Sequence, residues 1–162
     1  MTIYRLRVAG VPAPKGSLKC VGRGARHQLI EDDKTGARRR WRKTLTEAAQ
    51  QLAGRLPAPL DGPIAVGVLF VLPRPRASRR QLPTARSAGD LDKLLRMVAD
   101  VLTCADVIVD DSRIILTIPA KVYETEGRPP GVVIYVTDDP NPHARILSAV
   151  LDAAPELKEM GK

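Results

Sequence analysis

The segment GDLDKLLRMVAD, residues 89–100, places two aspartates one residue apart where an apolar helical pattern begins. Apolar residues recur in it, and just after it, at the three- and four-residue spacing of one helix face. That face consists of Leu91, Leu94, Leu95, Val98 and Leu102. A helix with one apolar stripe must bury that stripe against another element, so the segment predicts a helix packed on a sheet.

The segments on either side predict the rest of an α/β domain. Strands are expected at residues 2–10, 62–73, 113–124 and 131–138, and further helices at 36–54 and 142–153. This order predicts a single compact α/β domain with a mixed sheet of about four strands, two main helices and a C-terminal helix. We expect residues 1–139 to form the domain and residues 140–162 to form a helical tail.

Two segments lack any helical or strand period. Residues 11–26, VPAPKGSLKCVGRGAR, are rich in Pro, Gly and basic residues and predict a loop. Residues 73–89 are rich in Arg, Ser and Pro and predict a basic, mobile loop. The cysteines, Cys20 and Cys104, form no metal-binding or disulfide pattern, and Cys104 is expected to be a small buried residue.

Charge is distributed unevenly along the 162-residue chain, whose formal net charge is +8. Residues 1–89 carry 18 Lys and Arg against five Asp and Glu, whereas residues 90–162 carry eight against 13. The basic half favours binding to a polyanion such as a nucleic acid. Since no signal peptide or membrane-length apolar run is visible, we expect a cytoplasmic protein without a membrane partner.

Three aspartates in the acidic half are candidate metal ligands. Asp90 alone is a good helix cap, Asp92 suits the first turn, and Asp111 lies in an ordinary Asp-Asp turn with Asp110. If the chain after the helix folds back, all three carboxylates can converge, and they then need a cation to be stable together. Oxygen ligands without His or Cys suit Mg²⁺, with Mn²⁺ as a substitute.

Two cations accompany these acids in the sequence. Arg96 follows Asp92 by one helical turn, and Lys121 follows Asp111 by ten residues on the next expected strand. Arg96 can pair with Asp92 or Asp100, or it can point at a phosphate held by the metal. The same two readings apply to Lys121.

Residues 89–121 resemble the signature of RusA-type Holliday-junction resolvases, small endonucleases of phages and prophages. That signature runs D-x-D-N-x-x-K, an apolar helix, D-D, a short polar step, Ile or Val, and a Lys ten residues after the second Asp. The resemblance implies that Asp90, Asp92 and Asp111 ligate Mg²⁺, and that Lys121 assists catalysis. Two positions depart from the pattern: Arg96 stands where the family has its catalytic Lys, and Lys93 where it usually has Asn.

The resemblance also implies an activity and a partner. Enzymes of this family act as homodimers that cut two opposed strands of a four-way DNA junction, as DNA recombination and repair require. The basic half of the chain then supplies phosphate contacts, for which the candidates are Lys15, Arg38, Arg39, Arg42, Arg74, Arg76, Arg79 and Arg80. Two alternatives stay open: a nuclease acting on other branched DNA, and a protein that binds junctions through a decayed site.

Overall fold

The structure is a computed structural model that describes residues 2–16, 18–21, 28–31, 33, 35–139 and 143–161. Its centre is a four-stranded sheet in the order β1–β6–β4–β5, formed by β1 (Tyr4–Ala9), β6 (Gly131–Thr137), β4 (Ile64–Leu72) and β5 (Ile114–Tyr123). β4 and β5 pair in parallel, while β1–β6 and β4–β6 are antiparallel. The predicted mixed sheet of four strands is therefore confirmed.

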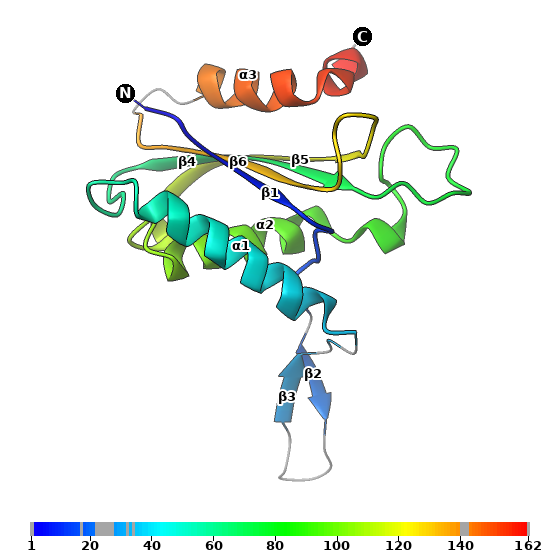
Figure 1. Ribbon diagram of the computed structural model, residues 1–162, viewed down its shortest axis with the longest axis horizontal. Helices are drawn as coiled ribbons and strands as arrows, with labels where there is room; N and C mark the ends of the chain where they lie inside the picture. Colours follow the sequence, from blue (N-terminus) through cyan, green and yellow to red (C-terminus); the bar gives the residue numbers. More distant parts are fainter. Residues whose placement is uncertain are drawn as a thin grey trace.

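Helices cover both faces of this sheet (Figure 1). α1 (Ala37–Ala53) and α2 (Leu91–Cys104) lie on one face, and α3 (His143–Ala153) lies on the other. The tail helix therefore docks on the sheet, and its Ile146 and Val150 are buried there. Together these layers confirm the predicted single α/β domain.

β4 is the strand on which both cores depend. All nine of its residues are buried, which explains its near-continuous apolar sequence, since a central strand faces a core on each side. Gly67 lets α3 approach, because a Cβ at this position would lie 2.8 Å from Ile146 Cγ2 and 2.9 Å from Val150 Cγ2. The other face of β4 packs with Phe70 against α1 and α2.

α2 connects the parallel strands β4 and β5 and begins close to its predicted start. The residues that it buries are Leu94, Met97, Val98, Val101 and Leu102. The predicted stripe omitted Met97 and Val101, whereas Leu91 and Leu95 are only half-buried. The apolar face is turned slightly from the predicted one, because α2 packs against α1 as well as against the sheet.

Two predictions, one about a loop and one about a cysteine, are wrong. The predicted loop at residues 11–26 contains β2 (Leu18–Val21), which pairs antiparallel with β3 (Gln28–Glu31) in a hairpin that projects from the domain (Figure 1). Each of these strands is only four residues long, which is the lower limit at which alternation can be read from a sequence. Cys104 ends α2 with an exposed side chain, since it lies on the face of the helix away from the core.

The segment between β4 and α2 is irregular, as predicted, apart from one 3-10 turn at Arg86–Ala88. Its mobility stays a prediction. Two further 3-10 helices are Asp111–Arg113, before β5, and Pro155–Gly161, after α3. Within the described part of the chain, no helix has the combination of length and apolar character that crossing a membrane requires.

Candidate active site at the start of α2

Asp90 occupies the N-cap position of α2 without acting as a cap. Its side chain makes no capping hydrogen bond to the helix, and it lies 3.0 Å from Lys93 Nζ, with 62% of the carboxylate side chain exposed. Gly89 before it has a φ of 77°, a left-handed conformation that favours glycine. The simple structural explanation of Asp90 as a helix cap therefore does not account for it.

Asp92 and Arg96 lie one turn apart on α2 and are both exposed. Within the described residues, neither side chain makes a hydrogen bond or an ion pair, so the predicted pairing of Arg96 with Asp92 or Asp100 is absent. Both residues line an apolar hollow of about 250 Å³ between α2 and β5, with Ile114 and Thr117 on its other side. The Asp92 carboxylate is thus available to a ligand, and Arg96 is available to an anion beside it.

Lys121 lies close to the acids at the start of α2. Its ammonium group donates a hydrogen bond of 2.8 Å to the carbonyl oxygen of Gly89, the residue before Asp90. This contact spans 32 positions of sequence and joins the second half of β5 to the first residue of the α2 entry turn. Lys121 is half-buried, so its charge is only partly screened by solvent.

Asp111 does not join this group within one chain. It begins the 3-10 turn Asp111–Arg113, which precedes β5 and follows the far end of α2. Since α2 has 14 residues, its two ends are separated by roughly 20 Å. The described residues accordingly contain no cluster of three metal-binding side chains. The expectation that the connection folds back is wrong for the single chain, because Asp111 precedes the start of β5, whereas Lys121 and the start of α2 lie near the other end of that strand.

The two acids of the Asp-Asp turn differ in their local roles. The Asp110 carboxylate accepts a 2.9 Å hydrogen bond from the backbone N–H of Ser112, and hydrogen bonding to Ser112 lowers the pKa of this carboxyl. Asp111 is exposed and makes no hydrogen bond or ion pair with any described residue. Asp110 is therefore a structural cap, whereas Asp111 is free to bind a ligand.

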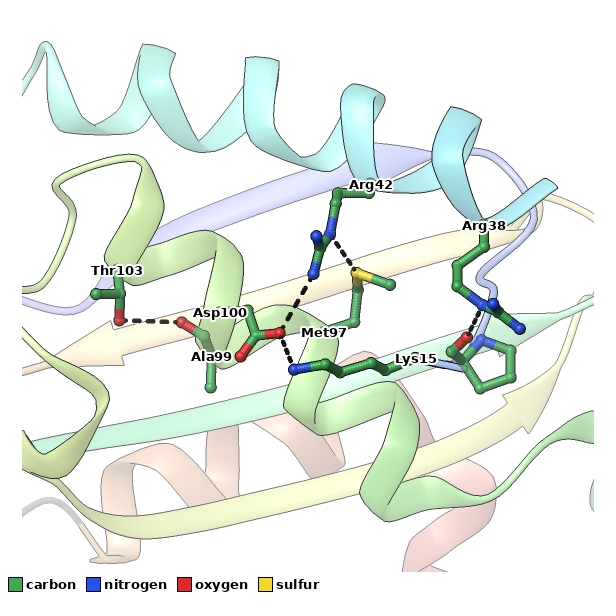
Figure 2. A network of polar contacts seen from close by, with 8 residues as sticks. Lys15, Arg38, Arg42, Met97, Ala99, Asp100 and Thr103 are labelled. Atoms are coloured by element: carbon green, nitrogen blue, oxygen red, sulfur yellow. Dashed lines mark hydrogen bonds and ion pairs between the residues drawn. The ribbon is translucent and has the colours of Figure 1, made fainter. Parts of the chain in front are cut away.

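Three of the predicted DNA contacts serve the fold. Lys15 Nζ lies 2.6 Å and Arg42 Nη2 lies 3.3 Å from the same oxygen of Asp100. Figure 2 shows Arg42 reaching from α1 to Asp100 on α2. Arg38 donates a 2.9 Å hydrogen bond to the carbonyl of Pro14. These contacts join α1, α2 and the segment after β1. Sequence reasoning missed Asp100 as the partner, because contacts between residues 58 and 85 positions apart leave no periodic signal.

The other predicted DNA contacts divide into two groups. Arg74 lies 4.6 Å above the ring of Tyr123 and donates to the Arg80 carbonyl, and Arg80 donates to Thr84. By contrast, the side chains of Arg39, Arg76 and Arg79 are exposed and have no ion pair or hydrogen bond within the described residues. This second group leaves three cationic side chains open to a polyanion.

Lys93 is a further residue of the site whose contact was not predicted. Its ion pair with Asp90 has the i, i+3 spacing that brings helix side chains together, so the signal was readable in the sequence. The Lys93 ammonium group therefore competes with any metal ion for the Asp90 carboxylate.

Carboxylates at a helix start, a lysine held beside them and an exposed arginine one turn along the helix form a site suited to hydrolysis of a phosphodiester. The comparison with family models agrees with this class: residues 9–137 match the model described as Endodeoxyribonuclease RusA. The chain therefore belongs to the RusA family, a family of endodeoxyribonucleases, and the resemblance noted in residues 89–121 is confirmed over most of the chain. No curated protein matches the chain.

Proposed function

We propose that the protein is a metal-dependent, cytoplasmic endonuclease that resolves four-way DNA junctions in recombination and repair. The observation that carries this proposal is the start of α2, where the Asp90 and Asp92 carboxylates lie beside a lysine held at 2.8 Å from the Gly89 carbonyl. Membership of an endodeoxyribonuclease family supports the reaction class. In this proposal Arg96 and Lys121 stabilise the charge that develops on the phosphate.

Mg²⁺ is the proposed cofactor, with Mn²⁺ able to replace it. The donors fit a hard cation, because carboxylate oxygens are present and no His or Cys lies among the three candidate ligands. One chain supplies only Asp90 and Asp92, which is two of the three proposed ligands. When bound, such an ion supplies charge neutralisation and an activated water.

A homodimer supplies the missing ligand in this proposal. β5 is an edge strand, its Ile115 is 68% exposed, and the apolar hollow beside Asp92 lies along the same side of the molecule. A two-fold axis there, perpendicular to α2, reverses the direction of α2 in the second copy, so the Asp111 end of one chain meets the Asp92 end of the other. Two composite sites then act on two opposed strands of a junction.

In this proposal, Arg39, Arg76 and Arg79, whose side chains are exposed, make the main contacts to DNA phosphates. Recognition depends on the shape and charge of the branched substrate, since these side chains extend from a helix start and an irregular loop rather than from a groove-reading element. Lys15, Arg38, Arg42, Arg74 and Arg80 add positive charge while they hold the fold together.

A second candidate function is junction binding without cleavage. The Lys93–Asp90 ion pair and the replacement of the family's catalytic Lys by Arg96 favour it, because an arginine does not donate a proton readily and one ligand is already paired. The deciding experiment is cleavage of a synthetic mobile four-way junction in Mg²⁺ and in EDTA, beside a linear duplex.

We expect paired nicks in the junction alone, only with Mg²⁺ or Mn²⁺, and a loss of at least ~100-fold in the Asp92→Asn protein. Strand-resolved gels with each arm labelled in turn measure this. Tight junction binding without nicks in either metal would establish the decayed site, and equal binding to junction and duplex would overturn both candidates.

The Lys93–Asp90 pair leads to a prediction about metal dependence. Replacing Lys93 by Asn should lower the Mg²⁺ concentration for half-maximal cleavage by up to about fivefold, because an exposed ion pair is worth at most ~1 kcal/mol. A Mg²⁺ titration of the cleavage rate measures it. Lys43→Asn is a matched control, since Lys43 pairs with Glu47 on the exposed side of α1 and should leave the titration unchanged. An unchanged midpoint in Lys93→Asn would show that Asp90 is not a ligand in competition with Lys93.

A further inference from the structure

A hollow of about 400 Å³ lies on the α3 face of the sheet, beside the edge strand β1. Arg5 and Arg7 form its side on β1, and Leu69 and Val133 belong to its apolar lining. α3 packs mainly on β4 and β5, so it leaves the part of this face next to β1 uncovered. None of the residues of the candidate active site lines this hollow, which is therefore a separate feature of the surface.

The lining of this hollow is positively charged, since it contains three arginines and no acidic residue. Arg128 is already used by the fold, because it pairs with Glu156 and donates a hydrogen bond to the carbonyl oxygen of Ala153. By contrast, Arg5 and Arg7 are exposed and make no hydrogen bond or ion pair with any residue that the structure describes. Two guanidinium groups at this hollow are therefore available to an anion.

The geometry of β1 sets the spacing of the two arginines. Side chains two residues apart on a strand leave the same face and are about 7 Å apart. The other face of β1 carries Leu6 and Val8, which are buried against α1. Charge on an edge strand also discourages pairing with other chains, but that role requires no hollow beside it. The spacing of Arg5 and Arg7 suits an anion whose charges repeat along one direction, as the phosphates of a DNA strand do.

The hollow and the candidate active site share one end of the sheet, on opposite faces. Arg7 of β1 pairs with Val133 of β6, which pairs with Leu69 of β4. Leu69 pairs in turn with Ala120 of β5, the residue before Lys121. Three strand spacings place the Cα atoms of Arg7 and Ala120 about 14 Å apart, which is less than the width of a DNA duplex. A duplex arm that leaves the crossover at this end of the sheet can therefore bring its backbone to the hollow while the cut strand stays at α2.

Resting on the proposed function, we propose that this hollow holds the sugar–phosphate backbone of one junction arm, close to the crossover. Two successive phosphates pair with Arg5 and Arg7, and the sugar between them packs on the apolar lining. DNA is the anion that fits, because the chain belongs to a family of endodeoxyribonucleases and because charged and apolar groups alternate along a DNA backbone. Since the lining has no polar side chains besides its arginines, the contact positions the arm and carries no base preference.

The experiment uses the whole chain with Asp92→Asn as the parent, so that binding is measured without cleavage. Arg5→Gln and Arg7→Gln are added together, and fluorescence anisotropy gives the affinity for a four-way junction over a range of salt concentrations. The double change should weaken binding by about tenfold and lower the slope of log affinity against log salt concentration by about two, because two phosphate contacts are lost. Since both side chains are exposed, the melting temperature should stay within about 3 °C of the parent.

Uncharged phosphates locate the contact on the DNA. Junctions are prepared in which two successive phosphates at a time are replaced by methylphosphonates. At one such pair, in an arm next to the crossover, the double arginine change should have no further effect on affinity, whereas its effect should persist at the other pairs. A matched control, Lys43→Gln with Lys158→Gln, removes the same charge from two exposed lysines that pair with acids. It should change the affinity by less than about threefold, since salt screens charge at a distance.

The outcomes separate the arm contact from the proposed function. Unchanged affinity and salt slope in the double arginine variant would overturn the arm contact. An effect that persists at every neutralised pair would also overturn it, because the effect would then come from charge at a distance. In both cases, a parent protein that prefers the junction over a duplex leaves the proposed function standing. No such preference in the parent would overturn the proposed function, and with it the assignment of the hollow to a junction arm.

Discussion

Cleavage of a four-way junction should reappear when one Asp92→Asn chain and one Asp111→Asn chain are combined in a dimer, although each protein alone is inactive. The reason is the separation of roughly 20 Å between the two ends of the 14-residue α2. If each site takes Asp92 from one chain and Asp111 from the other, the mixed dimer has one site with both changes and one site with neither. Co-expression with two different tags and purification on both gives dimers that each contain one chain of either kind.

The expected product is specific. A mixed dimer has one intact site, so it should nick one strand of the junction and should not make the paired cut of the wild-type protein. Its rate per dimer should be about half that of the wild type if the two sites act independently, an increase of at least ~50-fold over either mutant. Strand-resolved gels distinguish a single nick from paired nicks.

A matched pair of variants tests the geometry itself. Combining Asp90→Asn with Asp92→Asn should restore nothing, because both acids stand at the same end of α2 and each of the two sites then keeps one defect. Failure of the Asp92→Asn and Asp111→Asn pair to recover cleavage, in a dimer shown to be intact by light scattering, would contradict the shared site. Recovery in both pairs would show that the Asp90 and Asp92 of one site come from different chains.

The second large effect is expected at Lys121. Replacing it by Met should reduce the rate of cleavage at saturating junction by about 100-fold, because a preorganised cation next to the phosphate is lost. The change also removes the 2.8 Å hydrogen bond that holds the Gly89 carbonyl beside β5. Junction affinity should change by less than about threefold, since one phosphate contact among many is a small part of binding. Single-turnover cleavage and anisotropy measure the two quantities separately.

Two variants assign the cause of this loss. Lys121→Arg keeps the charge and should retain a larger part of the rate than Lys121→Met, although the guanidinium directs its donors differently. Lys43→Met, on the exposed side of α1, should leave both rate and affinity unchanged. A Lys121→Met protein that cleaves within about threefold of the wild type would restrict Lys121 to a structural role at the α2 entry turn.

The elements of the fold followed from local patterns. The alternation in β1, the continuous apolar run of β4 and the helical spacing in α1 and α2 are visible within short windows, and each element formed where it was predicted. The hairpin of β2 and β3 had no such pattern, because each of its strands is only four residues long. The buried face of α2 was predicted with an error of part of a turn, because α2 packs against α1 as well as against the sheet.

The candidate site was predicted residue by residue, but its assembly was not. The acids Asp90, Asp92 and Asp111 and the cations Arg96 and Lys121 were identified from spacing, and their roles stay predictions. The sequence did not show which of these side chains lie close together in space. The bond from Lys121 to Gly89 depends on the parallel pairing of β5 with β4, and the separation of Asp111 depends on the direction in which α2 crosses the sheet.

By itself, the sequence determined the class of fold, the position of α2 and the identity of the acids, because periodicity and charge act through neighbouring residues. Only the tertiary structure decided that Lys15 and Arg42 share Asp100 and that Asp110 is a cap, while Asp111 has no partner among the described residues. It also decided that the Tyr123 hydroxyl is buried without a hydrogen bond to any residue that the structure describes. These properties come from strand order and helix packing, which bring together groups that are distant along the chain.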